Sequence, residues 1–400
     1  MNNKWKGNIK KIKNKINFFL EGIVRREIMT IKRFNNYWIG LYILLTIFLI
    51  PYGYQTNNYK IFIPIFLFIN LFTYLLIDNK KIKKKKFVYI ILAIGIISIN
   101  LNIGILEKIK YIFVLMTIML IKKKIKINSL LSNIIYYSVF LSLFIQILIY
   151  RYNSIRRSYS IIDPNFSSII SFFFLVYCDK QGYKIGYLFS IITLFFFKSR
   201  AYFLALLLFY LVKIIKHSFK EKFLKLKINN FFVLSFISII LIYIISFIFL
   251  IYVSVENIPG KRNFNDISNK NRFLANVRVI GVLLNDPKGF FWGYGEKLEE
   301  KFIGNKPRSL YGIPHNSILK PLLIYGFFAI IIYLLIYGNE VNKRFNYENY
   351  EYIYSYFIFS MFLHSLFEMA YGIAFIYLLS LEKRNFSSGK IDRVLRNIFI

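Results

Sequence analysis

Runs of apolar residues long enough to cross a lipid bilayer recur along almost the whole chain, and they constrain its fold more than any other feature. The hydrocarbon core of a bilayer is about 30 Å thick, which a helix of about 20 apolar residues can span. Of the 400 residues, 57% are hydrophobic and 20% are aromatic, more than a soluble domain of this length contains. We therefore predict an all-α integral membrane protein.

The apolar runs predict twelve transmembrane helices in one membrane domain, residues 38–381. A basic segment, 1–37, precedes this domain, and a tail, 382–400, follows it. The N-terminal segment shows no small-residue cleavage site, so we interpret it as uncleaved. The predicted spans are 38–54, 61–77, 87–103, 107–121, 128–150, 166–178, 183–197, 201–216, 231–252, 317–337, 351–367 and 369–381.

The positive charges predict the orientation of these spans. An even number of spans places both termini on one side, and about two-thirds of the 54 Lys and Arg residues fall on that side. Both termini are therefore expected to be cytoplasmic. The net charge of +35 does not indicate nucleic-acid binding, because the lysines form short clusters between apolar runs. The single cysteine, Cys178, excludes an internal disulfide and an iron–sulfur cluster.

One predicted external loop, residues 253–316, is much longer than the others. Loops of more than about 15 residues are usually functional or disordered. This loop contains large apolar residues that can pack, namely Leu283, Leu284, Phe290, Phe291 and Trp292. Short helices are expected within it, and Asn271–Asp286 is the best candidate.

Several arginines lie on the predicted external side, where the charge rule makes them exceptions. Guanidinium groups grip phosphate oxygens bidentately and stay charged at any pH, so arginines that converge near the membrane surface would suit a lipid-linked diphosphate. The alternative is that each arginine anchors a span at the headgroups. These residues are Arg151, Arg156, Arg157, Arg200, Arg272 and Arg278.

The stretch Ile313–Gly326 joins the long loop to the span 317–337. It holds His315, one of only three histidines, and an unperturbed histidine pKa near 6.5 suits proton transfer. The alternative is that Asn316 simply caps the helix. Pro321 and Gly326 are expected to kink or thin this span, so that it approaches a neighbour or opens a groove for a lipid chain.

These motifs resemble those of the O-antigen ligase and polymerase superfamily. That family pairs an Arg-x3-Leu element with a His-[Asn/Ser/Gln]-x9-Gly-x2 element, and the two border one large external loop. The similar residues here are Arg200 to Leu204 and His315-Asn316 followed by Gly326. Ala329 departs from the family, which has Gly, Thr or Tyr at that position.

The long loop is also similar to that of the family, and the resemblance is best over residues 150–340. Arg272, Pro287 and Gly293-Tyr294-Gly295 follow a recurring pattern of arginine, proline and Gly-x-Gly. Asn276 stands where an aromatic residue is common. The Asp163-Pro164-Asn165 sequence is similar as well.

The resemblance implies a membrane glycosyltransferase of the bacterial inner membrane. Such an enzyme transfers a polyprenyl-diphosphate-linked glycan to an acceptor hydroxyl during synthesis of O-antigen, capsule or exopolysaccharide. Its partners would be that donor, a glycan or lipid-linked acceptor, and also a flippase and a chain-length regulator. No cofactor or metal is implied.

The resemblance also implies roles for individual residues. Arg200 and Arg272 would stabilise the leaving diphosphate, and His315 would orient or deprotonate the acceptor. The remaining candidates would bind substrate: Arg156, Arg157, Asp163, Asn165, Arg278 and Asn316.

Three alternatives stay open. A polymerase is slightly favoured over a ligase that joins glycan to lipid A-core, because Ala329 departs from the ligase pattern. A polysaccharide flippase also needs many spans, but it would carry charges within their cores, whereas Lys and Arg gather here at span ends. A structural membrane scaffold is the third. His364 and Glu368 are interpreted as hydrogen-bonding each other or the site rather than binding metal, and His217 as solvated.

Overall fold

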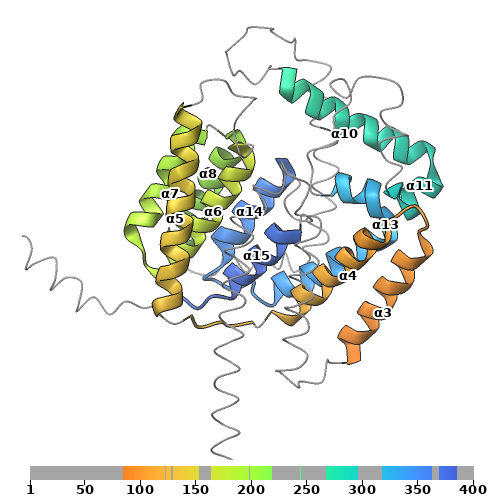
Figure 1. Cartoon of the computed structure of the whole chain (residues 1–400), viewed down its shortest axis with the longest axis horizontal. Helices are drawn as coiled ribbons and strands as arrows, with labels where there is room; N and C mark the ends of the chain where they lie inside the picture. Colours follow the sequence, from red (N-terminus) through yellow and green to blue (C-terminus); the bar gives the residue numbers. More distant parts are fainter. Residues whose placement is uncertain are drawn as a thin grey trace, which may run out of the picture.

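The computed structural model describes a helical protein over residues 84–121, 123–127, 129–152, 164–197, 199–218, 244, 267–295, 318–362 and 369–384 (Figure 1). Within these residues there is no strand beyond one isolated parallel bridge between Ile125 and Leu381. The prediction of an all-α fold is confirmed for this part of the chain. Its helices are α3 (Lys84–Ile99), α4 (Ile105–Leu120), α5 (Ser129–Tyr152), α6 (Pro164–Gln181), α7 (Lys184–Phe197), α8 (Arg200–Ser218), α10 (Ile267–Asn285), α11 (Pro287–Trp292), α13 (Leu319–Asn342), α14 (Tyr350–Phe362) and α15 (Met369–Ser380).

Three of the described helices are long and apolar enough to cross a membrane: α5, α8 and α13. The bounds of the other helices outside the long loop also follow the predicted spans closely, apart from the end of the span 351–367, which is not described. The predicted spans 38–54 and 61–77 lie outside the described residues, as does all of 231–252 except residue 244. The predicted helix in the long loop is confirmed, since α10 covers nearly all of Asn271–Asp286.

The two ends of the helix bundle differ in the elements that meet there. At one end, here called the basic end, the final turns of α4, α6, α8, α13 and α15 meet the first turn of α14. Lys216 of α8 pairs there with Glu351 of α14, and the guanidinium of Arg344 donates to Ile121 O after α4. At the other end, here called the loop end, α10 and α11 lie near the turn between α3 and α4 (Figure 1). These described helices thus alternate in direction as the sequence predicts.

The centre of the bundle is built from helices that are apolar on every side. From Ser167 onwards almost every side chain of α6 is buried, and so is every side chain of α15 from Tyr371 to Ser380. Aromatic rings join the central helices, with the ring of Tyr356 in α14 stacked 4.0 Å from that of Phe375 in α15. A helix buried all round belongs to the interior of a bundle.

Candidate functional site

The start of helix α11, in the long loop, is fixed by a capping side chain and a proline. Asp286 is its N-cap, and its carboxylate accepts a hydrogen bond from Gly289 N at 3.1 Å. Pro287 follows at the first helical position, where a missing N–H costs nothing. The other carboxylate oxygen of Asp286 accepts from the hydroxyl of Tyr294 at 3.0 Å. Asp286 therefore fixes both the start of α11 and the segment that follows it.

Helix α13 is broken where α11 meets it. Gly326 has φ 82° and ψ 170°, which lie outside helical values and in a region that side chains avoid. A Cβ atom on Gly326 would lie 2.5 Å from Phe291 O, and one on Gly293 would lie 2.5 Å from Ile324 O. The two backbones touch directly, which only glycine allows at both positions.

The break leaves helix carbonyls without their usual partners, and the loop supplies one. In an unbroken helix Leu323 O would accept from the N–H four residues later. Here it accepts from Tyr294 N at 2.7 Å. The kink expected in this span is therefore confirmed at Gly326, where α13 approaches a neighbour, α11. The kink expected at Pro321 is wrong: Pro321 lies in the first turn of α13, where proline fits a regular helix.

The turn between α3 and α4 completes this contact. A Cβ on Gly295 would collide with the carbonyl of Asn102, and the amide of buried Asn100 donates to Trp292 O. We call Gly293, Gly295 and Gly326, together with these backbone contacts, the glycine junction. It joins α11, α13 and the α3–α4 turn at the loop end.

A carboxylate that the sequence analysis did not select lies beside the junction. Glu107, in the first turn of α4, accepts a hydrogen bond at 2.9 Å from the hydroxyl of Tyr325, the residue before Gly326. The rings of Tyr325 and Tyr111 are 5.2 Å apart, and Tyr111 donates to the carbonyl of buried Ala329. An ionisable residue within a predicted span was the signal that could have identified Glu107.

The predicted site residues fall into three groups in the structure. Arg200 begins α8 and is half-buried, whereas Arg278 is exposed on α10. Helix α8 packs on α14 and α6, and α10 packs on α11 and α13. For Asn165 and Arg272 the structure gives only the helix, α6 and α10 respectively. The other candidates lie outside the described residues: Arg156, Arg157, Asp163, His315, Asn316, His364 and Glu368.

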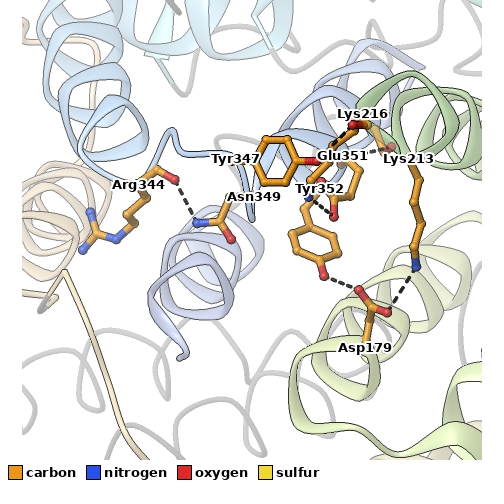
Figure 2. A network of polar contacts seen from close by, with 9 residues as sticks. Asp179, Lys213, Lys216, Arg344, Tyr347, Asn349, Glu351 and Tyr352 are labelled. Atoms are coloured by element: carbon orange, nitrogen blue, oxygen red, sulfur yellow. Dashed lines mark hydrogen bonds and ion pairs between the residues drawn. The ribbon is translucent and has the colours of Figure 1, made fainter. Parts of the chain in front are cut away.

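A second polar cluster lies at the basic end, among residues predicted to be cytoplasmic (Figure 2). Asp179 of α6 accepts from Lys213 Nζ of α8 at 3.4 Å and from the hydroxyl of Tyr352 of α14. Lys216 Nζ lies 2.9 Å from Glu351 Oε2. Each charge faces an opposite charge from another helix, so we interpret this cluster as joining α6, α8 and α14. His217, one residue further along α8, is exposed, as expected.

Lys180 is the most buried of the described lysines at the basic end. Its ammonium group donates to Leu379 O at 2.9 Å and to Leu381 O at 3.1 Å. Burial lowers the pKa of Lys180 to about 7, against the opposing effect of nearby carboxylates. Lys180 thus ties the end of α6 to the end of α15.

Among the described residues, no group of three or more His, Cys, Asp or Glu side chains is arranged to hold a metal ion. Comparisons of the chain with family models, with curated proteins and with solved structures find no match. The candidate site therefore rests on the chemistry of its own residues.

Proposed function

We propose that this protein is a membrane glycosyltransferase that moves a glycan from a polyprenyl diphosphate to an acceptor hydroxyl during synthesis of a surface polysaccharide. A polymerase, which extends a lipid-linked glycan, is preferred to a ligase. The site would lie at the loop end and would combine Arg200, Arg272 and His315.

The glycine junction is the observation that supports this proposal. Two short motifs separated by 30 residues in the sequence, Gly293-Tyr294-Gly295 and Gly326, touch through their backbones. The first belongs to the long loop, and the second belongs to the helix that follows His315. A fixed loop at the end of a span is what an enzyme needs where a donor held in the membrane meets an acceptor from water.

The proposed reaction is a displacement at the anomeric carbon of the donor sugar. The acceptor oxygen forms a new bond to this carbon, while the bond to the diphosphate oxygen breaks. His315 takes the acceptor proton, and Arg200 and Arg272 stabilise the charge that builds on the departing polyprenyl diphosphate. Arg156, Arg157 and Arg278 would help to hold the diphosphate, and Asp163, Asn165 and Asn316 would bind the sugar.

The test is glycan transfer by purified protein in lipid nanodiscs, with a polyprenyl-diphosphate-linked oligosaccharide as donor. His315→Ala is expected to lower transfer by about 10²-fold or more, the usual scale for a lost general base. His217→Ala is the matched control, because this histidine is exposed at the basic end, and it should leave transfer unchanged. Equal activity of the two variants would remove His315 from the mechanism.

The two arginines are tested by keeping their charge. Arg200→Lys and Arg272→Lys retain a cation but lose the planar fork that grips two phosphate oxygens, so both should impair transfer strongly. Arg393→Lys, in the predicted tail, is the control. Normal transfer by both site variants would leave these arginines as headgroup anchors.

A polysaccharide flippase is the second candidate, and the break in α13 favours it. Transporters also use discontinuous helices to bind their substrates. Movement of a fluorescent lipid-linked glycan across proteoliposomes, without glycan transfer by the same protein, would establish the flippase and reject the enzyme.

A further inference from the structure

Large apolar side chains are exposed around the glycine junction. They come from three elements: Leu101 in the α3–α4 turn is 90% exposed, Phe291 on α11 is 39% exposed and Phe328 on α13 is 36% exposed. The rings of Phe291 and Phe328 stack 5.3 Å apart, and the ring of Trp292 lies 5.3 Å from that of Phe328. We call these four residues the outer apolar patch. The three rings form one apolar surface, and an exposed apolar surface marks contact with a membrane or a partner.

The apolar length of the neighbouring helices indicates what covers the patch. The part of α13 that follows Gly326 has 16 residues, and α3 also has 16 residues, so each is about 24 Å long at about 1.5 Å per residue. That length is about 6 Å less than the hydrocarbon thickness of a bilayer, about 30 Å. Since these helices nearly cross the hydrocarbon, the glycine junction lies close to one boundary of the apolar slab rather than far outside it.

Charged and aromatic groups occur together at this level. Glu107 bonds to Tyr325 beside the junction, and Lys108 Nζ donates to Ser98 O at 3.2 Å. Charges at the headgroups with aromatic rings just beneath them are typical of a membrane interface. Lys288, exposed one turn before Trp292, has a side chain long enough to carry its ammonium group to the headgroups.

Three hydrogen bonds of the non-helical backbone at this level are made within the protein. Asn100 donates to Trp292 O, and Asn102 N donates back to the side-chain oxygen of Asn100 at 2.9 Å. Tyr294 N donates to Leu323 O. Irregular backbone is tolerated beside lipid only where protein groups satisfy it in this way.

We propose that α11 lies in the outer interface of the membrane, with the outer apolar patch against the acyl chains just below the lipid headgroups. The long loop is then held on the membrane surface by α11 instead of projecting into water. The outer side follows from the predicted orientation of the spans, and the placement of α11 at the interface does not depend on glycan transfer.

Tryptophan fluorescence tests this placement, because the chain has only three tryptophans, Trp5, Trp38 and Trp292. Trp5→Phe with Trp38→Phe leaves Trp292 as the single reporter in nanodiscs of phosphatidylcholine. Adding Trp292→Phe and Phe291→Trp moves the reporter to the exposed ring. Lipids brominated either near the headgroup or near the chain end then quench emission according to depth.

A matched control comes from the same helix. Leu335 is 44% exposed on α13, seven residues after Phe328 and therefore about 10 Å deeper. With Leu335→Trp as the single reporter, in a chain that also carries Trp292→Phe, the deep bromine should quench more than the shallow one. With either Trp292 or Phe291→Trp as the single reporter, the shallow bromine should quench more than the deep one.

Three outcomes would overturn the placement. Quenching of Trp at position 291 by aqueous iodide but by neither brominated lipid would place α11 in water. Stronger quenching there by the deep bromine would place α11 in the hydrocarbon core. Protection of that position from both iodide and lipid would mean that protein covers the patch.

Discussion

Replacing Gly326 with alanine is expected to separate α11 from α13. The new Cβ would lie 2.5 Å from Phe291 O and 2.6 Å from Gly293 N, both of them backbone atoms that cannot rotate away. Alanine at the φ of 82° would also be strained by about 1–3 kcal/mol. If α13 straightens instead, Leu323 O returns to its helical partner and Tyr294 N loses its acceptor, a loss of about 1 kcal/mol.

Either response predicts that the free energy of opening at the junction falls, by about 1–3 kcal/mol. Since each 1.4 kcal/mol is a factor of ten, amide hydrogen exchange in residues 287–295 should accelerate by about 5- to 140-fold. Exchange measured by mass spectrometry in nanodiscs reads this out directly. Exchange at the basic end should not change.

Gly281→Ala is the matched control for this prediction. A Cβ on Gly281, in the interior of α10, meets nothing within 4 Å, so the change should stabilise α10 by about 0.5–1 kcal/mol. If Gly326→Ala leaves exchange in 287–295 unchanged, the backbone contact at the junction does not hold α11. The reasoning would also be refuted if Gly281→Ala accelerated exchange there to the same extent.

Two further predictions concern single polar groups. Asp286→Ala removes both the cap of Gly289 N and the acceptor of the Tyr294 hydroxyl, so the free energy of opening of α11 should fall by about 1–3 kcal/mol and its amide exchange should accelerate. Asp286→Asn keeps a capping oxygen and should retain most of the protection, and equal loss in both variants would contradict the capping role. Lys180, with a folded pKa of about 7 below an unfolded value of 10.5, binds fewer protons when folded between these pH values, so its burial penalty is full below pH 7 and is relieved as pH rises towards 10.5. The thermal midpoint in detergent should therefore rise with pH across this window more in the unmodified protein than in Lys180→Met, and parallel curves would refute the assignment.

The helical fold could be predicted because it depends on the simplest pattern in the sequence. Uninterrupted apolar runs are imposed by the bilayer itself, so hydropathy located α13 and the other described spans to within a few residues. The helix α10 was visible from its composition as well. The interior position of α6 and α15 was not predicted, because spans that face lipid and spans that face protein are equally apolar.

Only those features of the candidate site that depend on a single segment of the sequence could be predicted. The glycine at position 326 suggested a kink because glycine interrupts helices regardless of their surroundings. That this kink would meet Gly293 is a tertiary contact, and no pattern within either segment reveals it. Asn100 and Glu107 were missed for the same reason: each is a single polar residue near the end of a span, and its role appears only when Trp292 O or Tyr325 lies beside it.

The level of the glycine junction links the fold to the proposed chemistry. A lipid-linked diphosphate is confined to the headgroup region, so a residue that acts on it must be held at that height. The bonds from Asn100 to Trp292 O and from Tyr294 N to Leu323 O hold α11 against the α3–α4 turn and α13 at this height. His315 precedes Gly326 by eleven residues on the same short stretch, and Arg272 lies on the α10 helix that packs on α11. A displaced α11 would therefore alter the positions of both His315 and Arg272 in the proposed site. Gly326→Ala should accordingly reduce glycan transfer even though it changes no reacting group, and normal transfer in that variant would separate the junction from catalysis.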